Sequence, residues 1–180
     1  AASVAAFGGV AGASVAVGIA LAENRIANRV QAGVQNTTLN AGALIVSAVE
    51  DAAIDASAQA AAVAAACSIG GGVTGGGAEV TSAVETATQA EIRSSVVTVS
   101  GDLTVSAACT ATAGAEVDVE SVAGALGGVA TAGSVTTVTI TPTVAATVTG
   151  GTVQARGVLV AAMVTPQGSA DANGVTVSTG

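Results

Sequence analysis

The sequence predicts an all-β fold, a parallel β-solenoid (β-helix), from three observations. The apolar residues are almost all small, short segments alternate between β-branched and other residues, and two landmarks recur along the chain every 56–63 residues. A solenoid stacks such repeats so that each contacts only its neighbours. We therefore treat residues 1–180 as a single β-solenoid segment, and expect it to be part of a longer protein or a filament subunit that stacks.

The composition allows only a thin core. Hydrophobic residues make up 51% of the chain, yet it contains one Phe, one Met and no Trp or Tyr. The layers of a β-sandwich lie about 10 Å apart, and Ala and Val are too small to fill that gap at the density of a protein interior. They can fill the thin core that forms when successive turns of the backbone lie directly on one another.

Charge excludes several functions. Four Arg and no Lys stand against twelve carboxylates, for a net charge of -8. The basic surface that nucleic-acid binding requires is missing, so we expect no nucleic-acid partner.

Residues 1–22 are uncharged and long enough to cross a bilayer, but they lack flanking basic residues and interfacial aromatics. We expect no membrane span.

Two landmarks define the repeat. The first is a Gly-Gly-Val sequence, found at Gly8-Gly9-Val10, Gly71-Gly72-Val73 and Gly127-Gly128-Val129. The second follows about thirty residues later and is a Gly before an alternating apolar segment, at 42–48, 101–107 and 157–162. We expect about three repeats, each of roughly three coils of ~20 residues. At ~4.8 Å between strands, the resulting nine coils would form a rod of about 40 Å.

Local patterns favour short strands. The segments 96–99, 103–105, 117–120, 135–144 and 175–177 alternate β-branched residues with others, and Gly-Gly or Asn-Gly pairs separate them. A helix over Ile19–Val34 is the alternative for that segment, because its apolar residues also recur at three- and four-residue steps. The equivalent segments of the other repeats are rich in Thr and Val, which favours a strand.

The segment Gly8–Ala48, which begins GGVAGASVAV and ends NAGALIVSA, resembles the Ala/Gly-rich repeat region of giant bacterial surface exoproteins. These are the filamentous-haemagglutinin-like and autotransporter-type adhesins. The resemblance covers all three repeats and is one of texture and spacing. It implies a right-handed parallel β-helix, secretion to the extracellular cell surface, and an adhesive or fibre-forming role with a host surface or matrix as ligand.

The sequence offers no catalytic constellation, and we expect no enzymatic activity. A nucleophilic Ser, Thr or Cys needs a nearby base, usually His, and the chain has no His, Lys or Tyr. Paired carboxylates can hydrolyse glycosides, but the aromatic platforms usual at such sites are missing.

Cys67 and Cys109 would lie about two coils apart, farther than a disulfide reaches. Two free, buried thiols are therefore favoured over a bridge.

Glu116, Asp118 and Glu120 are the candidate metal ligands. On a strand, alternate residues share a face, so these three would point outward while Val117 and Val119 pack inward. A bound Ca²⁺ would relieve the repulsion between them, and the alternative is a solvated acidic stripe. We expect no other cofactor.

Two further groups are less specific. A looser acidic group lies at Glu50, Asp51 and Asp55. Alternating hydroxyls about 6.7 Å apart, an array that can order water, lie at Thr137, Thr139, Thr141 and Thr143. Ice binding needs such an array on adjacent coils, where the aligned residues differ, so the β-propensity of Thr explains this stripe.

The sequence thus predicts a structural extracellular fibre or adhesin stalk, held together by backbone hydrogen bonds and stacked apolar residues. The alternatives are an adhesive binding module of a surface protein and an ice-binding or Ca²⁺-binding solenoid. Solenoids need capped ends, and neither end of this sequence has the polar character of a cap. We therefore expect end-to-end self-association into filaments or continuation in a longer chain.

Overall fold

The computed structural model describes residues 2–7, 13–66, 71–124 and 127–179, and their regular structure is entirely β. The strands are β1 (Ala2–Phe7), β2 (Ser14–Gln35), β3 (Thr38–Ala41), β4 (Leu44–Ala66), β5 (Gly72–Val99), β6 (Asp102–Gly124), β7 (Val129–Gln154) and β8 (Gly157–Thr179). The predicted all-β fold is confirmed. Ile19–Val34 lies within β2, so the helical alternative for this segment is wrong.

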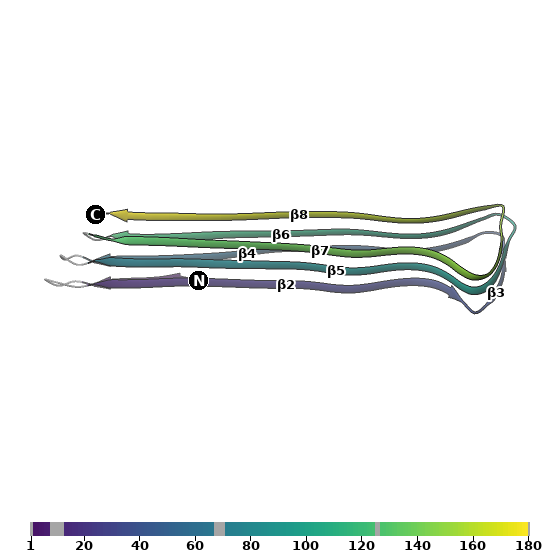
Figure 1. Cartoon of the computed structure of the whole chain (residues 1–180), viewed down its shortest axis with the longest axis horizontal. Coiled ribbons are helices and arrows are strands. Elements are labelled where there is room, and N and C mark those ends of the chain that lie inside the picture. Colours follow the sequence, from purple (N-terminus) through teal and green to yellow (C-terminus); the bar gives the residue numbers. More distant parts are fainter. Residues whose placement is uncertain (1, 8–12, 67–70, 125–126, 180) are drawn as a thin grey trace.

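The strands form two parallel sheets that face each other (Figure 1). Sheet A has the order β1-β4-β6-β8. Sheet B has β5 at its centre, between β7 on one side and β2 with the short β3 on the other. The chain runs along sheet B, turns at the end marked by β3, and returns along sheet A. Each such circuit is one coil of a flattened parallel solenoid.

The register of the strands sets the length of a coil. Paired residues are 58 apart between β2 and β5, 59 between β4 and β6, 56 between β5 and β7, and 55 between β6 and β8. A whole repeat is therefore one coil. The predicted division of each repeat into three shorter coils is wrong, and the chain makes about three coils instead of nine.

Strand length explains this difference. The long strands have 22 to 28 residues, because glycines that were expected to end strands, such as Gly75 and Gly174, lie inside them. At about 3.3 Å per residue, a 23-residue strand spans roughly 75 Å, whereas three coils stack to only about 14 Å. The molecule is therefore elongated along its strands (Figure 1), whereas the expected rod would be elongated along the stacking direction.

The landmarks are only partly in register. Val73 pairs with Val129, as the first landmark predicts, but in the first coil it pairs with Val15 and not with Val10. Residues 8–12 lie outside the described residues. The second landmark is in register between the first two repeats, where Leu103 pairs with Leu44. In the third repeat it is shifted by one residue, because Leu103 pairs with Val158 and not with Leu159.

One end of each coil bends at a residue in the left-handed conformation. These residues are Asn36 (φ 50), Ser94 (φ 49) and Gly150 (φ 61), which occupy equivalent positions when successive coils are aligned by the strand register. Asn and Gly adopt this conformation more readily than other residues. At Gly151 (φ 121), a Cβ would lie 2.1 Å from the Ser95 carbonyl oxygen, so that position requires glycine.

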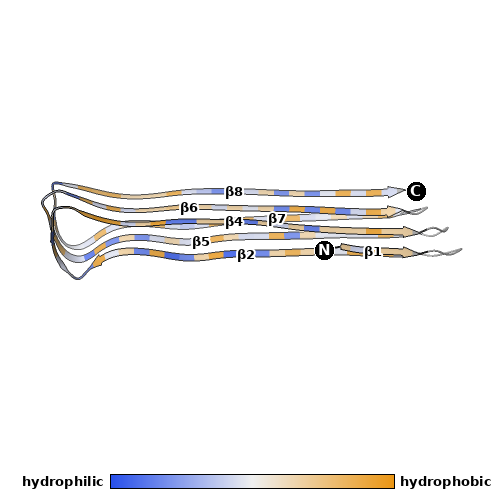
Figure 2. Ribbon diagram, turned by 180° about the vertical axis from the view of Figure 1, so that it is seen from behind, coloured by the Kyte–Doolittle hydropathy of each residue, from blue (hydrophilic) through white to orange (hydrophobic). Residues whose placement is uncertain are grey.

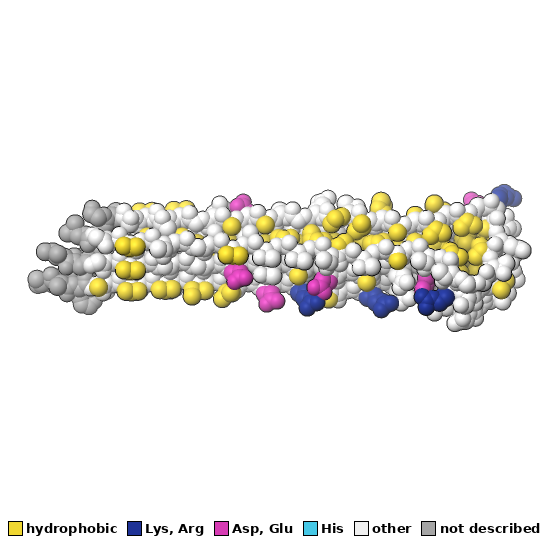
Figure 3. Space-filling view, viewed as in Figure 1, with side chains coloured by type: hydrophobic (Ala, Val, Ile, Leu, Met, Phe, Trp, Pro, Cys, Tyr) yellow, Lys and Arg dark blue, Asp and Glu magenta, His cyan; other side chains and the backbone are white. Residues whose placement is uncertain are grey.

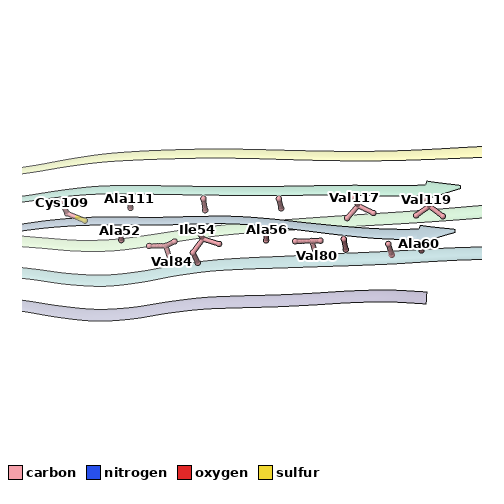
Figure 4. Packing of buried hydrophobic residues seen from close by; sticks show 14 residues of the cluster. Ala52, Ile54, Ala56, Ala60, Val80, Val84, Cys109, Ala111, Val117 and Val119 are labelled. Carbon is pink, nitrogen blue, oxygen red and sulfur yellow. The ribbon is translucent and has the colours of Figure 1, made fainter. Parts of the chain in front are cut away.

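The core is a thin layer of small side chains between the sheets, as the composition predicts. Val80 and Val84 of β5 face Ala52, Ile54 and Ala56 of β4 (Figure 4). A second cluster beside the bend contains Ile92, Val97, Leu103 and Val105. Along the strands, buried and exposed positions alternate, as over residues 52–60, because successive residues point to opposite faces of a sheet. Figure 2 shows hydrophilic positions interspersed among hydrophobic ones along the long strands.

Candidate functional site

The outer face of sheet A carries the acidic residues that the sequence singled out. Glu116 and Glu120 are exposed and Asp118 is partly exposed on β6, while Val117 and Val119 are buried. The predicted orientation of these five residues is confirmed. Their separation along one strand is fixed by the two-residue period, so the neighbouring strands decide what else surrounds them.

The register brings further oxygen atoms to this face. Glu116 is the Cα partner of Ser57 on β4 and of Asp171 on β8. Asp118 lies between Gln59 and Asn173, and its Oδ1 accepts a hydrogen bond from Asn173 Nδ2 at 3.4 Å. Two carboxylates directly opposite each other, as at Glu116 and Asp171, repel. Sequence reasoning missed Asp171, because a whole coil separates it from its partner along the chain.

A groove of about 350 Å³ lies beside this pair. It is lined by Asp55, Gly114, Glu116, Ser169 and Asp171, among others. The floor is open because Gly114 has no side chain: a Cβ there would lie 3.1 Å from Asp55 Oδ1 and 3.6 Å from Ser169 Oγ.

Carboxylate and hydroxyl oxygens such as these are ligands that Ca²⁺ prefers. Within the described ranges, however, no three Asp, Glu, Cys or His side chains are grouped so as to hold a metal ion. The Ca²⁺ site at Glu116, Asp118 and Glu120 therefore stays a prediction, and the groove is an oxygen-lined surface.

Glu50 does not belong to this surface. It points between the sheets, like Ala48 and Ala52 on the same strand, whereas Asp51 points outward. The looser acidic group expected from the sequence is thus divided, because adjacent residues of a strand face opposite ways. Glu50 Oε2 accepts a hydrogen bond from Thr88 Oγ1 at 2.8 Å, and Oε1 is buried without a hydrogen-bond partner among the described residues.

Cys109 lies beside Glu50 in the register of β4 and β6. It is a free, buried thiol with its Sγ 3.2 Å from Thr86 Oγ1. Cys67, the second cysteine, lies outside the described residues.

Sheet B carries a polar cluster close to the bend. Glu91 points outward but is almost completely buried, because three neighbouring side chains lie against its carboxylate. The carboxylate accepts hydrogen bonds from Gln31 Nε2 (3.0 Å), from Gln35 and from Arg93 Nη2 (2.8 Å). Gly33 lies beneath it, where a Cβ would be only 3.1 Å from Glu91 Cγ. This cluster joins β2 to β5, which is a structural role.

The Thr stripe is one strand wide. The four threonines of β7 point outward, with Val138 and Ile140 inward, as predicted. Their partners on β5 are Thr81, Ala83, Glu85 and Ala87. The flat array of hydroxyls that an ice-binding face needs is therefore not repeated on the adjacent coil.

At the end opposite the bend, both outer faces are apolar. Valines in register form one ladder on sheet B, Val15–Val73–Val129, and one on sheet A, Val4–Val63–Val122–Val177. Figure 3 shows hydrophobic side chains along this end of the face that contains β2, while the charged side chains lie towards the bend.

The most extensive feature is a pair of open strand edges. We call the free edges of β7 and β8 the β7/β8 edge, and the free edges of β2 and of residues 44–60 in β4 the β2/β4 edge. The latter is open because β1 pairs only with residues 61–66 of β4. Core positions at these edges are uncovered: Leu103 is 0% exposed, but its partner Val158 on β8 is 57% exposed.

Known proteins give no guide to this surface, since no protein-family model matches the chain and no curated protein or solved structure is significantly similar. No helical segment in the described ranges has the length and apolarity needed to cross a membrane.

Proposed function

We propose that this chain is a structural element of an extracellular fibre or adhesin stalk, in which further β-coils continue the stack at its open edges. One observation carries the proposal. Core-facing residues of the outermost strands are apolar but exposed, as at Val148, Val158, Val160 and Val164, while their partners in the middle coil are buried. An uncovered apolar row with free backbone groups is the surface that another coil covers.

The mechanism is mechanical. Each additional coil forms backbone hydrogen bonds along its two long strands and removes one row of core side chains from water. Each added coil lengthens the fibre by ~4.8 Å, so one copy of this chain contributes about 14 Å. A fibre of such coils is a ribbon roughly 75 Å broad, the length of one long strand. The proposal includes no catalytic step and no nucleic-acid partner.

The surroundings we propose follow from the resemblance to surface exoproteins and from composition. Four Arg and one Phe in 180 residues offer few cleavage sites to proteases that cut at basic or aromatic residues. Two of the four Arg are also engaged in ion pairs, Arg25 with Glu85 (2.5 Å) and Arg93 with Glu91 (2.8 Å). These properties suit an element that stays exposed outside the cell.

Electron microscopy and fibre diffraction of the purified chain test the proposal. We expect ribbons about 75 Å broad with a ~4.8 Å reflection along the long axis. Val158→Asp should abolish them, because a carboxylate would then face the core of the next coil. Leu159→Asp is the matched control, since Leu159 is also 57% exposed but points outward. Compact single chains at high concentration, with no ribbons, would refute self-stacking.

A further inference from the structure

The two open edges fit each other in sheet B. The strand register makes Ile26, Val84 and Ile140 equivalent positions of successive coils, so Ile26 of a second copy continues the same row after Ile140. Four core-facing apolar residues of β2 then meet similar residues of β7, at Ile26–Ile140, Val30–Val144, Ala32–Ala146 and Val34–Val148. Two core-facing amides do not, since Asn24 meets Val138 and Asn28 meets Pro142. The charged residues of β2 meet hydroxyls, at Glu23–Thr137, Arg25–Thr139 and Arg29–Thr143. No like charges face each other along these strands.

Sheet A independently gives the same register. There Leu44, Leu103 and Val158 are equivalent positions. The residue numbers of the first and last coil differ by 114 in both sheets, from Leu44 to Val158 and from Ile26 to Ile140. Residues 158–174 of β8 then lie beneath residues 44–60 of β4, the part of that strand left open by β1. A single placement of the second copy therefore satisfies both sheets.

The remaining part of β8 meets an obstacle. Residues 175–179 would have to pair with residues 61–65 of β4, where β1 already lies. Moving the second copy one strand farther away would keep β1 in place but would leave a gap of a whole strand beneath β2. Figure 2 shows β1 along only one part of the length of the molecule, so it fills only one part of this layer.

Displacing β1 loses fewer strand pairings than leaving a gap beneath β2 would. β1 forms six residue pairs with β4. The placement that removes it brings 21 of the 22 residues of β2 opposite β7, and gives β4 a partner along nearly its whole length. The end of β8 also suits the vacated position: Thr176 and Val177 would replace Ser3 and Val4, and Val177 already belongs to the same outer ladder in its own copy.

From this geometry we infer that β1 is a displaceable strand, and that β8 of a second copy of this chain takes its place when the two copies stack. The inference rests on the proposed function and specifies its partner and register. In the single chain, β1 covers part of the β2/β4 edge. It must therefore leave β4 before β8 of each further copy can pair there.

A reversible lock tests this inference. In a Cys67→Ser, Cys109→Ala background, Val4→Cys and Val63→Cys place two thiols on Cα partners of β1 and β4. Neighbouring strands lie about 4.8 Å apart, within the range of a disulfide. The matched control joins β4 to β6 through Val63→Cys and Val122→Cys, which are also Cα partners and stay paired in the stack.

We expect the oxidised β1 lock to form no ribbons in electron microscopy until a reductant is added. The oxidised control should form them at the rate of the unlinked background, and deletion of residues 1–7 should shorten the lag before assembly. Ribbons from the oxidised β1 lock at the control rate would overturn the inference while leaving the proposed function standing. If none of the variants assembles, self-stacking and the inference fail together.

Discussion

The middle coil, β5 with β6, and the outer coil, β7 with β8, use the same kinds of residue in very different surroundings. Ile92 in the middle coil is 1% exposed, and Val148, its Cα partner in the outer coil, is 37% exposed. The residue type hardly changes, but the covering neighbour is missing. Position in the stack, and not hydrophobicity, therefore decides which apolar residues of this chain are buried.

The largest test of this comparison places the same charge in both coils. Leu103→Asp places an unpaired carboxylate in the core, between Leu44 of β4 and Val158 of β8. We expect this change to lower the free energy of unfolding by about 4 kcal/mol or more. Val158→Asp at the partner position faces water in the single chain and should change it by about 0.5 kcal/mol or less. Urea unfolding followed by circular dichroism measures both, and equal losses would contradict the comparison.

Backbone directions provide a second test. Successive residues of a parallel strand direct their N–H and C=O groups to opposite neighbours. Ser14 N donates to Gly71 O (3.3 Å), and Thr131 Oγ1 donates to Thr74 O (3.2 Å). Core-facing residues of sheet B therefore direct these groups towards the following coil. Pro142 faces the core on β7, so the N–H that it lacks belongs to the open edge.

A pair of adjacent alanines on β7 exploits this direction. Ala145→Pro removes an N–H directed at β5, and we expect the free energy of unfolding to fall by about 1–3 kcal/mol. Ala146→Pro removes an N–H directed at the open edge, and should leave the single chain almost unchanged while it weakens stacking. Thermal melting and sedimentation separate the two effects. Equal destabilisation of the single chain would show that the assigned directions are wrong.

The bend offers a smaller contrast between coils. The outer coils place Asn36 and Gly150 in the left-handed conformation, but the middle coil places Ser94 there. Ser94→Gly should raise the free energy of unfolding by roughly 0.5–1 kcal/mol, because the strain on Ser94 exceeds the entropy cost of glycine. Thermal melting of the variant beside the unchanged chain measures the gain.

Ser95→Gly is the control for that change. Ser95 Oγ is buried and donates to Arg93 O at 2.8 Å, so its loss should lower stability by about 1 kcal/mol. A loss of stability in both variants would show that Ser94 is not strained.

The smallest expected effect concerns the carboxylates that face each other across the two coils. Neutralising one of them with Glu116→Gln should raise the free energy of unfolding by about 0.2–1 kcal/mol. If Ca²⁺ binds at Glu116, Asp118 and Glu120, it should raise the melting temperature of the unchanged chain more than that of the variant, and EDTA should reverse the gain. Glu79→Gln on sheet B is the control, since its partners are Leu21 and Val135.

Much of the fold could be predicted from local patterns, but coil length could not. A two-residue alternation identifies strands and their inner faces, as at Val117 and Val119, wherever it occurs. It does not indicate where a strand ends, because glycine fits inside an extended strand when neighbours on both sides supply hydrogen bonds. The bend of each coil lies at Asn36, Ser94 and Gly150, whose shared role becomes visible only when the coils are aligned.

The candidate site divides in the same way. The sequence identified Glu116, Asp118 and Glu120 because they share one strand and one face. It placed Asp55 in a separate acidic group and missed Asp171, because the proximity of both to Glu116 depends on the register between strands that belong to different coils. The burial of Glu50 was missed for a related reason: it depends on which face of β4 meets β5.

By itself, the sequence determined that this chain is a thin-cored, parallel β-structure, because residues this small fill space only when strands lie close together and successive side chains alternate. Tertiary structure alone decided that each repeat makes one coil and not three, which residues neighbour each carboxylate, and which strand edges stay open. These depend on pairing between residues far apart in the chain, which local residue order does not encode.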